Sequence, residues 1–308
     1  TDAFGHIGVC RDIKSFLNLS GNNLKLRIPE LDFKVDNNNL PISISIKDKE
    51  SCSCYYGLTI QNTTVKESPF WLKQKLNSIG LVPVNNIVDI TNFILFETGN
   101  PLHAFDYDKI EKNKILIKKS DDIKNFKKID GQEIELNADD LVISDGFKNL
   151  CLAGVIGGKE SSVTIDTKNI FLESACFDSI LVRRTSKKHL IQTDASYRFE
   201  RGVDFGNCEY ALKRAAMLIK SVIPGAKISS EIISTVNKKK TNKKVIPWSY
   251  QKFYKLIGQK VDEKKIEKIL NDLDFKIDNS NKLFEGALIE VPSYRVDVSR
   301  DVDIFEEV

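Results

Sequence analysis

Histidine and long hydrophobic runs are both scarce in this sequence of 308 residues, which has three histidines. No stretch of about 18 uncharged apolar residues occurs, which excludes a membrane-spanning helix of ordinary length. Residues 1–12 lack the basic and apolar regions of a signal peptide. The sequence therefore predicts a cytoplasmic protein without a membrane partner.

A strong excess of one charge is absent as well, with 46 basic and 43 acidic side chains and a net charge of +3. A nucleic-acid-binding domain usually has a marked basic excess, so only local clusters of cations could bind nucleic acid here. Disulfides and a zinc site are not expected either. The six cysteines match no zinc-binding spacing and stand among apolar residues, which indicates buried, reduced thiols.

What the sequence has is enough apolar content for two or three domains, because 41% of its residues are hydrophobic. The run 238–244 (KKKTNKK) has no apolar residue and indicates a linker. We predict an α+β multidomain fold around it. The ranges are 1–40, a preceding segment; 41–236, a module of mixed sheets and helices; 237–245, the basic linker; and 246–308, a small helix-helix-strand module.

Hydrophobic periodicity predicts the elements within these ranges. The predicted helices are 8–18 in the preceding segment and, in the large module, 69–79, one from Asn85 or Asn86 to Gly99, 178–189 and 208–222. Strands are predicted near 42–48 and 55–61 and, as short pieces, between 114 and 172, where an Asp-Gly turn indicates a hairpin. In the small module we expect helices capped by Ser249 and Asp262, then two strands near 274–278 and 287–292 joined by residues 279–281.

His103 is the first candidate functional residue, because it follows a Gly-Asn-Pro turn at the end of an apolar helix. On that helix Asp89 and Asn92 are three residues apart, with Thr91 beside them, so they share a face. An unpaired buried polar group costs about 1–3 kcal/mol, so these side chains must be hydrogen-bonded or used by a ligand. Taken alone, the segment is explained better by a hydrogen-bond network that holds the turn than by a binding site.

Two other strings could contribute to a site. The run 152–158 (LAGVIGG) places Gly154, Gly157 and Gly158 after a strand, where backbone N–H groups could donate to an oxygen, although a tight turn explains them more simply. Glu173 lies within an apolar strand-like run. Its carboxylate must be exposed at an edge or partnered, and it could recognise a hydroxyl group.

Charged clusters occur at three places. The run 183–189 (RRTSKKH) is either a phosphate-binding patch or a solvated helix face, and 193–204 (TDASYRFERGVD) has more small polar and ionic residues than a solvated loop needs. Near the end of the sequence, carboxylates cluster around Ser299. If this serine caps a helix, the last two carboxylates lie one turn beyond Asp303, on the same face of the helix. Such clustered oxygens suit Mg²⁺, or else an acidic helix N-terminus. These residues are Asp297, Ser299, Asp301, Asp303, Glu306 and Glu307.

Six strings, in this order along the chain, resemble the β subunit of bacterial phenylalanine–tRNA ligase. They are VNNIVDITNFILFETGNPLHAFD, AGVIGG, LESACFD, RRTSKKH, TDASYRFERGVD and VPSYRVDVSRDVDIFEEV. The resemblance covers the whole sequence and implies an internal part of that subunit. Residues 1–40 are then the tail of its first core domain, 41–236 its tRNA-editing module, and 246–308 a small module with a winged-helix, DNA-binding-like fold that stops before the family's synthetase-like domain.

The resemblance implies an α₂β₂ enzyme in which the α subunit charges tRNA-Phe with phenylalanine, using ATP that this part alone does not bind. The editing module hydrolyses tyrosine wrongly attached to that tRNA. A second site is physically necessary, because an apolar phenylalanine pocket rejects an analogue with an added hydroxyl by only about 10²-fold. The chemistry implied is ester hydrolysis by a positioned water. No serine or cysteine with an adjacent base indicates a covalent intermediate.

Carried over position by position, the resemblance makes His103, Asn92 and Glu173 the catalytic residues, with Glu173 at the tyrosine hydroxyl. Substrate-binding positions are expected at Thr91, Gly154, Gly157, Thr193 and Ala195. Magnesium ligands, shared with the α subunit, are expected at Asp297, Asp303, Glu306 and Glu307. The sequence departs from the family's pattern at Val82, Leu190 and Phe205, which are not among these positions.

Two other interpretations stay open. The chain could be a non-catalytic scaffold for assembly and tRNA docking within the synthetase. It could also be a freestanding DNA-binding protein built around the small module, which its nearly neutral charge disfavours.

Overall fold

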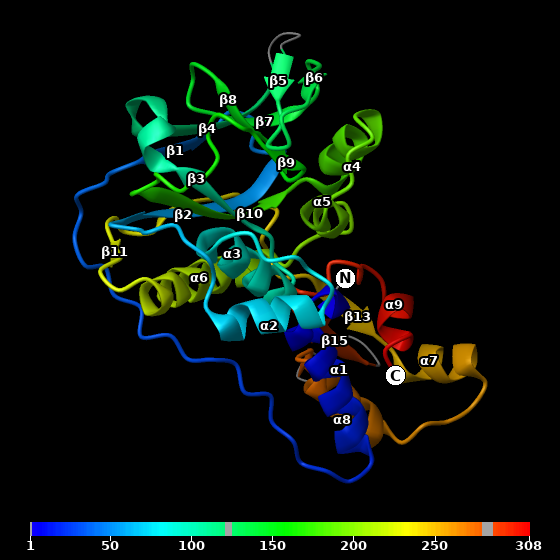
Figure 1. The fold of residues 1–308 in the computed structure, drawn as a ribbon. Coiled ribbons are helices and arrows are strands. Elements are labelled where there is room, and N and C mark those ends of the chain that lie inside the picture. Colours follow the sequence, from blue (N-terminus) through cyan, green and yellow to red (C-terminus); the bar gives the residue numbers. More distant parts are fainter. Residues whose placement is uncertain (1, 121–124, 279–285) are drawn as a thin grey trace.

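The large module has three layers, with a central sheet between a second sheet and a layer of helices (Figure 1). The computed structural model describes residues 2–120, 125–278 and 286–308. The central sheet has the strand order β11-β2-β10-β3, and β12 also pairs with β2. Its strands are β2 (Cys52–Gln61), β3 (Leu102–Asp106), β10 (Ile170–Phe177), β11 (Lys227–Ile228) and β12 (Ile233–Val236).

The second sheet has the order β1-β4-β7-β8-β9, and one hydrophobic core fills the space between the two sheets. Its strands are β1 (Ser43–Ile46), β4 (Lys114–Lys119), β7 (Leu141–Ser144), β8 (Asn149–Leu152) and β9 (Ile156–Gly157). The predicted Asp-Gly hairpin is present as β5 (Asn125–Lys127) and β6 (Glu133–Glu135).

Helices cover the other face of the central sheet and enclose a second core. They are α2 (Phe70–Ser78), α3 (Asn86–Thr98) and α6 (Cys208–Val222). Every residue of β10 is buried because both faces of the central sheet are covered. Successive side chains of a strand point to opposite faces, so Leu172 packs toward the helices whereas Phe171 packs between the sheets.

Helices α4 (Ser179–Lys188) and α5 (Asp194–Phe199) follow β10 and pack together beside the two sheets (Figure 1). The predicted basic helix is confirmed as α4, with Asp178 as its N-cap. Helix α5 is absent from the sequence-based predictions. Short 3₁₀ turns occur at Asp2–Phe4, Tyr107–Lys109, Glu111–Asn113 and Phe205–Asn207.

The small module has its own core and a three-stranded sheet of order β13-β15-β14. Its elements are β13 (Val245–Trp248), α7 (Tyr250–Ile257), α8 (Glu263–Asp272), β14 (Lys276–Asp278), β15 (Ala287–Glu290) and α9 (Asp301–Phe305). The predicted helices and two strands are confirmed, and β13 is an additional strand. The predicted connection 279–281 lies outside the described residues. The mixed α+β class of the whole chain is therefore confirmed.

Helix α1 (His6–Leu19) contacts both modules. It packs on α3 of the large module and on α8 of the small one. Arg11 donates to Asp274 at 2.8 Å, and Asn18 donates to Asp272 at 3.0 Å, which ties the helix to the small module. Among the described residues, no helix is long and apolar enough to cross a membrane.

Two sequence-based expectations were wrong. Cys10 is exposed, although the other five cysteines are buried as predicted. Ser299 does not cap the last helix, because Arg300 is its N-cap and the helix ends at Phe305. Glu306 and Glu307 therefore lie beyond the C-terminal end of α9 and not on its face.

Asp89 belongs to a hydrogen-bond network that holds the start of α3. Its side chain has no exposed surface and accepts from the Ser68 hydroxyl at 2.5 Å and the Val84 N–H at 2.8 Å. Asn85 caps the same helix end by accepting from the N–H groups of the second and third residues after it. For Asp89, the interpretation of this segment as a hydrogen-bond network is therefore confirmed.

We expect Asp89→Ala to lower the free energy of unfolding by about 2–4 kcal/mol, because the buried Ser68 hydroxyl and the part-buried Val84 N–H lose their acceptor. Urea denaturation measures this change. The control is Asp166→Ala at an exposed position, which should change stability by less than about 0.5 kcal/mol. Equal stability of the two variants would contradict the network.

Candidate active site

His103 and Glu173 stand directly opposite each other on the antiparallel strands β3 and β10. Side chains of such a pair leave the same face of the sheet, with their Cβ atoms about 5 Å apart. The face is the one toward the second sheet, since the next residue pair on that face, Phe105 and Phe171, belongs to the core between the sheets. The structure thus brings together two residues that are 70 positions apart in the sequence.

Glu173 is a buried acid that accepts one hydrogen bond from within the described part of the chain. Tyr55, which is fully buried on β2, donates its hydroxyl to a carboxyl oxygen of Glu173 at 2.7 Å. Burial raises the pKa of Glu173 to about 8, and the Tyr55 hydrogen bond offsets only part of that effect. The group is therefore mostly uncharged at neutral pH. Sequence reasoning missed Tyr55, because nothing in the string CSCYYGLTIQ distinguishes it from a core aromatic residue.

His103 is an uncharged imidazole in the same space. Burial lowers its pKa to about 4, so the ring is neutral at pH 7. The ring packs edge-on against Phe105 with 4.4 Å between centroids, and its Nε2 atom is buried without a hydrogen-bond partner in the described part of the chain. A buried nitrogen in this state is available to a ligand or a water.

Glycines let the β8–β9 loop approach these side chains. A Cβ atom on Gly157 would lie 2.7 Å from Cε1 of His103, closer than real Cβ atoms come. Gly154 has a φ of +70°, and a Cβ there would lie 3.0 Å from Val182 and 3.1 Å from Phe199. The glycine-rich run is therefore a wall of the site as well as a tight turn.

These residues enclose a small cavity of about 80 Å³. Strands β3 and β10, the glycine loop and α5 all contribute to its lining. The lining residues are Pro101, Leu102, His103, Cys151, Gly154, Val155, Ile156, Gly157, Glu173, Ala195 and Phe199. Of the predicted site residues, the cavity thus gathers His103, Glu173, Gly154, Gly157 and Ala195.

Thr193 holds the cavity wall without lining it. Its hydroxyl donates to the carbonyl of Val155 in the glycine loop at 2.9 Å. The same oxygen accepts from the N–H of Ser196, whose own hydroxyl accepts from Thr193 N, and this capping box starts α5. Thr193 therefore couples the position of α5, and with it Ala195, to that of the loop.

The structure does not bring Thr91 and Asn92 into this cavity. Both lie on α3, which packs against the other face of the central sheet. The Thr91 hydroxyl donates to the carbonyl of Val88 in its own helix, and Asn92 is half-buried. Their substrate-binding and catalytic roles stay predictions.

The four predicted magnesium ligands are not gathered into a metal site. Asp303 accepts from the N–H groups of Ser299 and Arg300 at the start of α9, at 2.9 and 2.8 Å. Arg295 binds Asp297 at 2.8 Å and also pairs with Glu307. Glu306 is exposed. No group of three or more histidine, cysteine, aspartate or glutamate side chains placed to hold a metal occurs in the described ranges. The magnesium site shared with the α subunit stays a prediction.

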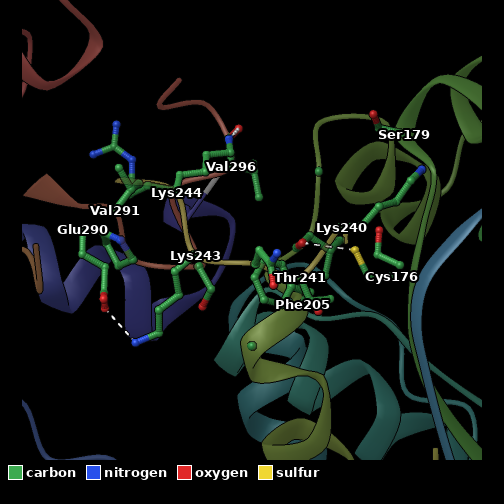
Figure 2. Close-up of a pocket in the computed structure, with 18 of the residues that line it drawn as sticks. Cys176, Ser179, Phe205, Lys240, Thr241, Lys243, Lys244, Glu290, Val291 and Val296 are labelled. Carbon is green, nitrogen blue, oxygen red and sulfur yellow. Dashed lines mark hydrogen bonds and ion pairs between the residues drawn. The ribbon is translucent and has the colours of Figure 1, made fainter. Parts of the chain in front are cut away.

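A larger cavity of about 520 Å³ lies at the junction of the two modules (Figure 2). Linker lysines line it, but their charges are used within the protein. The partners are Asp178 for Lys240, Glu290 for Lys243, and the carbonyls of Val296 and Val298 for Lys244. Because these ammonium groups already have partners, the cleft offers little free positive charge to an anion.

Comparison with known proteins identifies the family of the chain. Residues 51–224, more than half of the chain, match the family model of the B3/4 domain. The chain belongs to the B3/4 domain family. Residues 246–308 of this family member match the tRNA synthetase B5 domain.

The whole chain is similar to phenylalanine–tRNA ligase beta subunits. It is 42% identical to that of Bacteroides fragilis (strain YCH46) and 40% identical to that of Carboxydothermus hydrogenoformans, covering 100% of this chain and 37% of each relative. The resemblance drawn from the six strings is confirmed. The chain spans little more than a third of the length of these curated relatives.

One solved structure is also similar, an N-terminal fragment of the phenylalanyl-tRNA synthetase beta-subunit from Pyrococcus horikoshii. It covers 98% of this chain and 80% of its own, at 16% identity and a TM-score of 0.43. A likeness this weak supports no conclusion about the site.

The raised pKa of Glu173 has a consequence for stability. Its folded-state pKa of about 8 lies above the ordinary 4.5, so the folded protein keeps a proton that the unfolded chain releases. Stability from this group is full below pH 4.5 and is lost as pH rises toward 8. We expect the stability of Glu173→Gln relative to the parent to increase between pH 5 and pH 8 by on the order of 3 kcal/mol.

Urea denaturation at the two pH values measures this difference. His103 titrates in both proteins, so its contribution cancels. Asp166→Asn, at an exposed position, is the control and should follow the parent at both pH values. A Glu173→Gln difference that is the same at pH 5 and pH 8 would show that Glu173 is ionised in the folded protein.

Proposed function

We propose that this chain is the editing part of a phenylalanine–tRNA ligase β subunit, and that it hydrolyses tyrosine wrongly attached to phenylalanine tRNA. The names of its relatives support the enzyme. The observation that carries the editing role is the buried carboxyl group of Glu173 beside the neutral ring of His103, in a cavity with otherwise mostly apolar walls. In this proposal the charging of the tRNA, which uses ATP and Mg²⁺, requires the whole α₂β₂ enzyme with its α subunit.

Selectivity for tyrosine follows from the burial of Glu173. A tyrosyl group brings a phenol hydroxyl that can hydrogen-bond to the carboxyl group, whereas a phenylalanyl group leaves the second carboxyl oxygen unpaired against an apolar ring. Sites built to bind a substrate hydroxyl reject the analogue without it by about 10⁴–10⁵-fold. The hydrogen bond from Tyr55 fixes the orientation of the carboxyl group before the substrate arrives.

Tyrosine binding requires the cavity to open. Its volume of about 80 Å³ is roughly half that of the engineered cavity of about 150 Å³ that binds benzene. The wall that can move is the pair formed by the glycine loop and α5, which the Thr193–Val155 hydrogen bond holds together. The site closes over the aromatic ring when the two return, which excludes bulk water.

The hydrolysis needs one water and one proton acceptor. The oxygen of water bonds to the ester carbonyl carbon, and the bond from that carbon to the ribose oxygen breaks. His103 Nε2, which has no hydrogen-bond partner among the described residues, accepts the proton from the water and returns it to the ribose oxygen. Backbone N–H groups of the glycine loop stabilise the negative charge that develops on the carbonyl oxygen.

The proposed function predicts different defects for the two central residues. His103→Ala should slow deacylation of Tyr-tRNA-Phe by about 10²–10⁴-fold, because general base catalysis is lost. Glu173→Gln should lower the ratio of Tyr-tRNA-Phe to Phe-tRNA-Phe hydrolysis. Release of labelled amino acid measures both.

Asp166→Asn is the control for these assays and should match the parent. Deacylation by both site variants at the parental rate would contradict the assignment. A folded parent chain that releases no tyrosine would instead support the scaffold function.

A further inference from the structure

Helix α4 presents four cations to solvent on one side of the candidate active site. The cations are Arg183, Arg184, Lys187 and Lys188, and all four are exposed. Its ten residues include no acid. No ion pair with any of the four cations occurs among residues 2–120, 125–278 and 286–308, in contrast to the paired lysines of the linker.

This charge pattern is unfavourable for the helix itself. Arg183 and Lys187 are four residues apart, as are Arg184 and Lys188, and like charges at this spacing destabilise a helix. Lys187 and Lys188 lie in the last turn, where the helix dipole favours cations. Arg183 and Arg184 lie before that turn and gain nothing from it. A polyanion bound along the helix reduces the repulsion between these cations.

The inner side of α4 is firmly attached to the site. Thr185 and His189 both bind the buried Asp140, at 3.1 and 2.7 Å. Val182 packs where a Cβ on Gly154 would fall, so α4 lies directly behind the cavity wall. Because the inner residues anchor the helix, the outer cations keep a fixed position relative to the cavity.

More exposed cations occur where the glycine loop ends. Lys159 follows the loop, and its N–H donates to the carbonyl of Lys127 on β5. Both lysines are exposed. Strands β5 and β9 and helices α4 and α5 lie at the same end of the molecule (Figure 1). The positive surface therefore extends from α4 to the end of the glycine loop.

We propose that the outer face of α4 binds the sugar–phosphate backbone of the RNA whose aminoacylated 3′ end enters the cavity. The proposal rests on the proposed function for its choice of polyanion. Guanidinium groups bind phosphate oxygens in a bidentate manner, so Arg183 and Arg184 supply the principal contacts. The contacts are independent of sequence and position the RNA end for hydrolysis.

The test compares two double variants of the full chain that remove the same charge. Arg183→Gln/Arg184→Gln changes α4, and Lys264→Gln/Lys265→Gln changes two exposed cations of α8. The probe is uncharged tRNA-Phe transcript, whose binding needs no hydrolysis. We expect only the α4 variant to raise Kd, on the order of tenfold at 0.1 M salt, and to lower the slope of log K against log [salt] by about 1.5.

Deacylation of Tyr-tRNA-Phe supplies the second readout. The α4 variant should raise KM with kcat unchanged, because neither arginine lines the cavity. Equal Kd and equal salt slope for the parent and both variants would overturn the proposed role of α4. An equal loss of tRNA affinity in both variants would also overturn it. Binding through α4 by a chain that hydrolyses no ester would leave the surface standing and refute the proposed function.

Discussion

The hydrogen bond from Tyr55 to Glu173 is the interaction on which the site depends. A carboxyl group between two sheets costs several kcal/mol if it is charged and unpaired. The protein accommodates it by keeping it protonated at neutral pH, with a pKa of about 8, and by giving it one fixed donor. What remains is a polar group in a mostly apolar cavity, and a second hydroxyl satisfies it best.

The register of β3 against β10 decides whether that space is a site. His103 opposes Glu173 in the present register, and a slip by one residue would send it to the helix-covered face. Gly99, with a φ of +80°, ends α3 and lets the chain reverse into β3. Gly157 then admits the imidazole ring because it has no side chain. The strand register and two glycines thus determine where His103 lies.

Local signals predicted the helices well, because caps and periodicity are written in neighbouring residues. The helix 208–222 and the cap Gly99 were found at their observed positions, and Asn85 is the N-cap of the two candidates, Asn85 and Asn86. Helix α5 was missed because its six residues are too few for a periodic pattern, although its Thr193–Ser196 capping box is visible in the sequence. Strand β13 was missed because it contains Pro247, which does not favour a strand.

The site itself was less predictable, because sequence spacing does not say which face of a sheet a helix covers. The resemblance supplied His103 and Glu173, and the structure places them together. It also supplied Asn92, which α3 carries on the opposite face of the sheet. Tyr55 could not be found from the sequence, since its role depends on strands that pair across more than 100 residues.

The most direct test of the central claim is the protonation state of Glu173, followed by the ¹³C chemical shift of its carboxyl carbon across a pH titration of the folded protein. The account predicts a midpoint near 8 in the parent. It also predicts a lower midpoint when a phenol occupies the cavity, because its hydroxyl stabilises the charged form. A midpoint near the ordinary value of 4.5 would mean that the carboxyl group is solvated, and the account of a buried acid that selects a hydroxyl would be wrong.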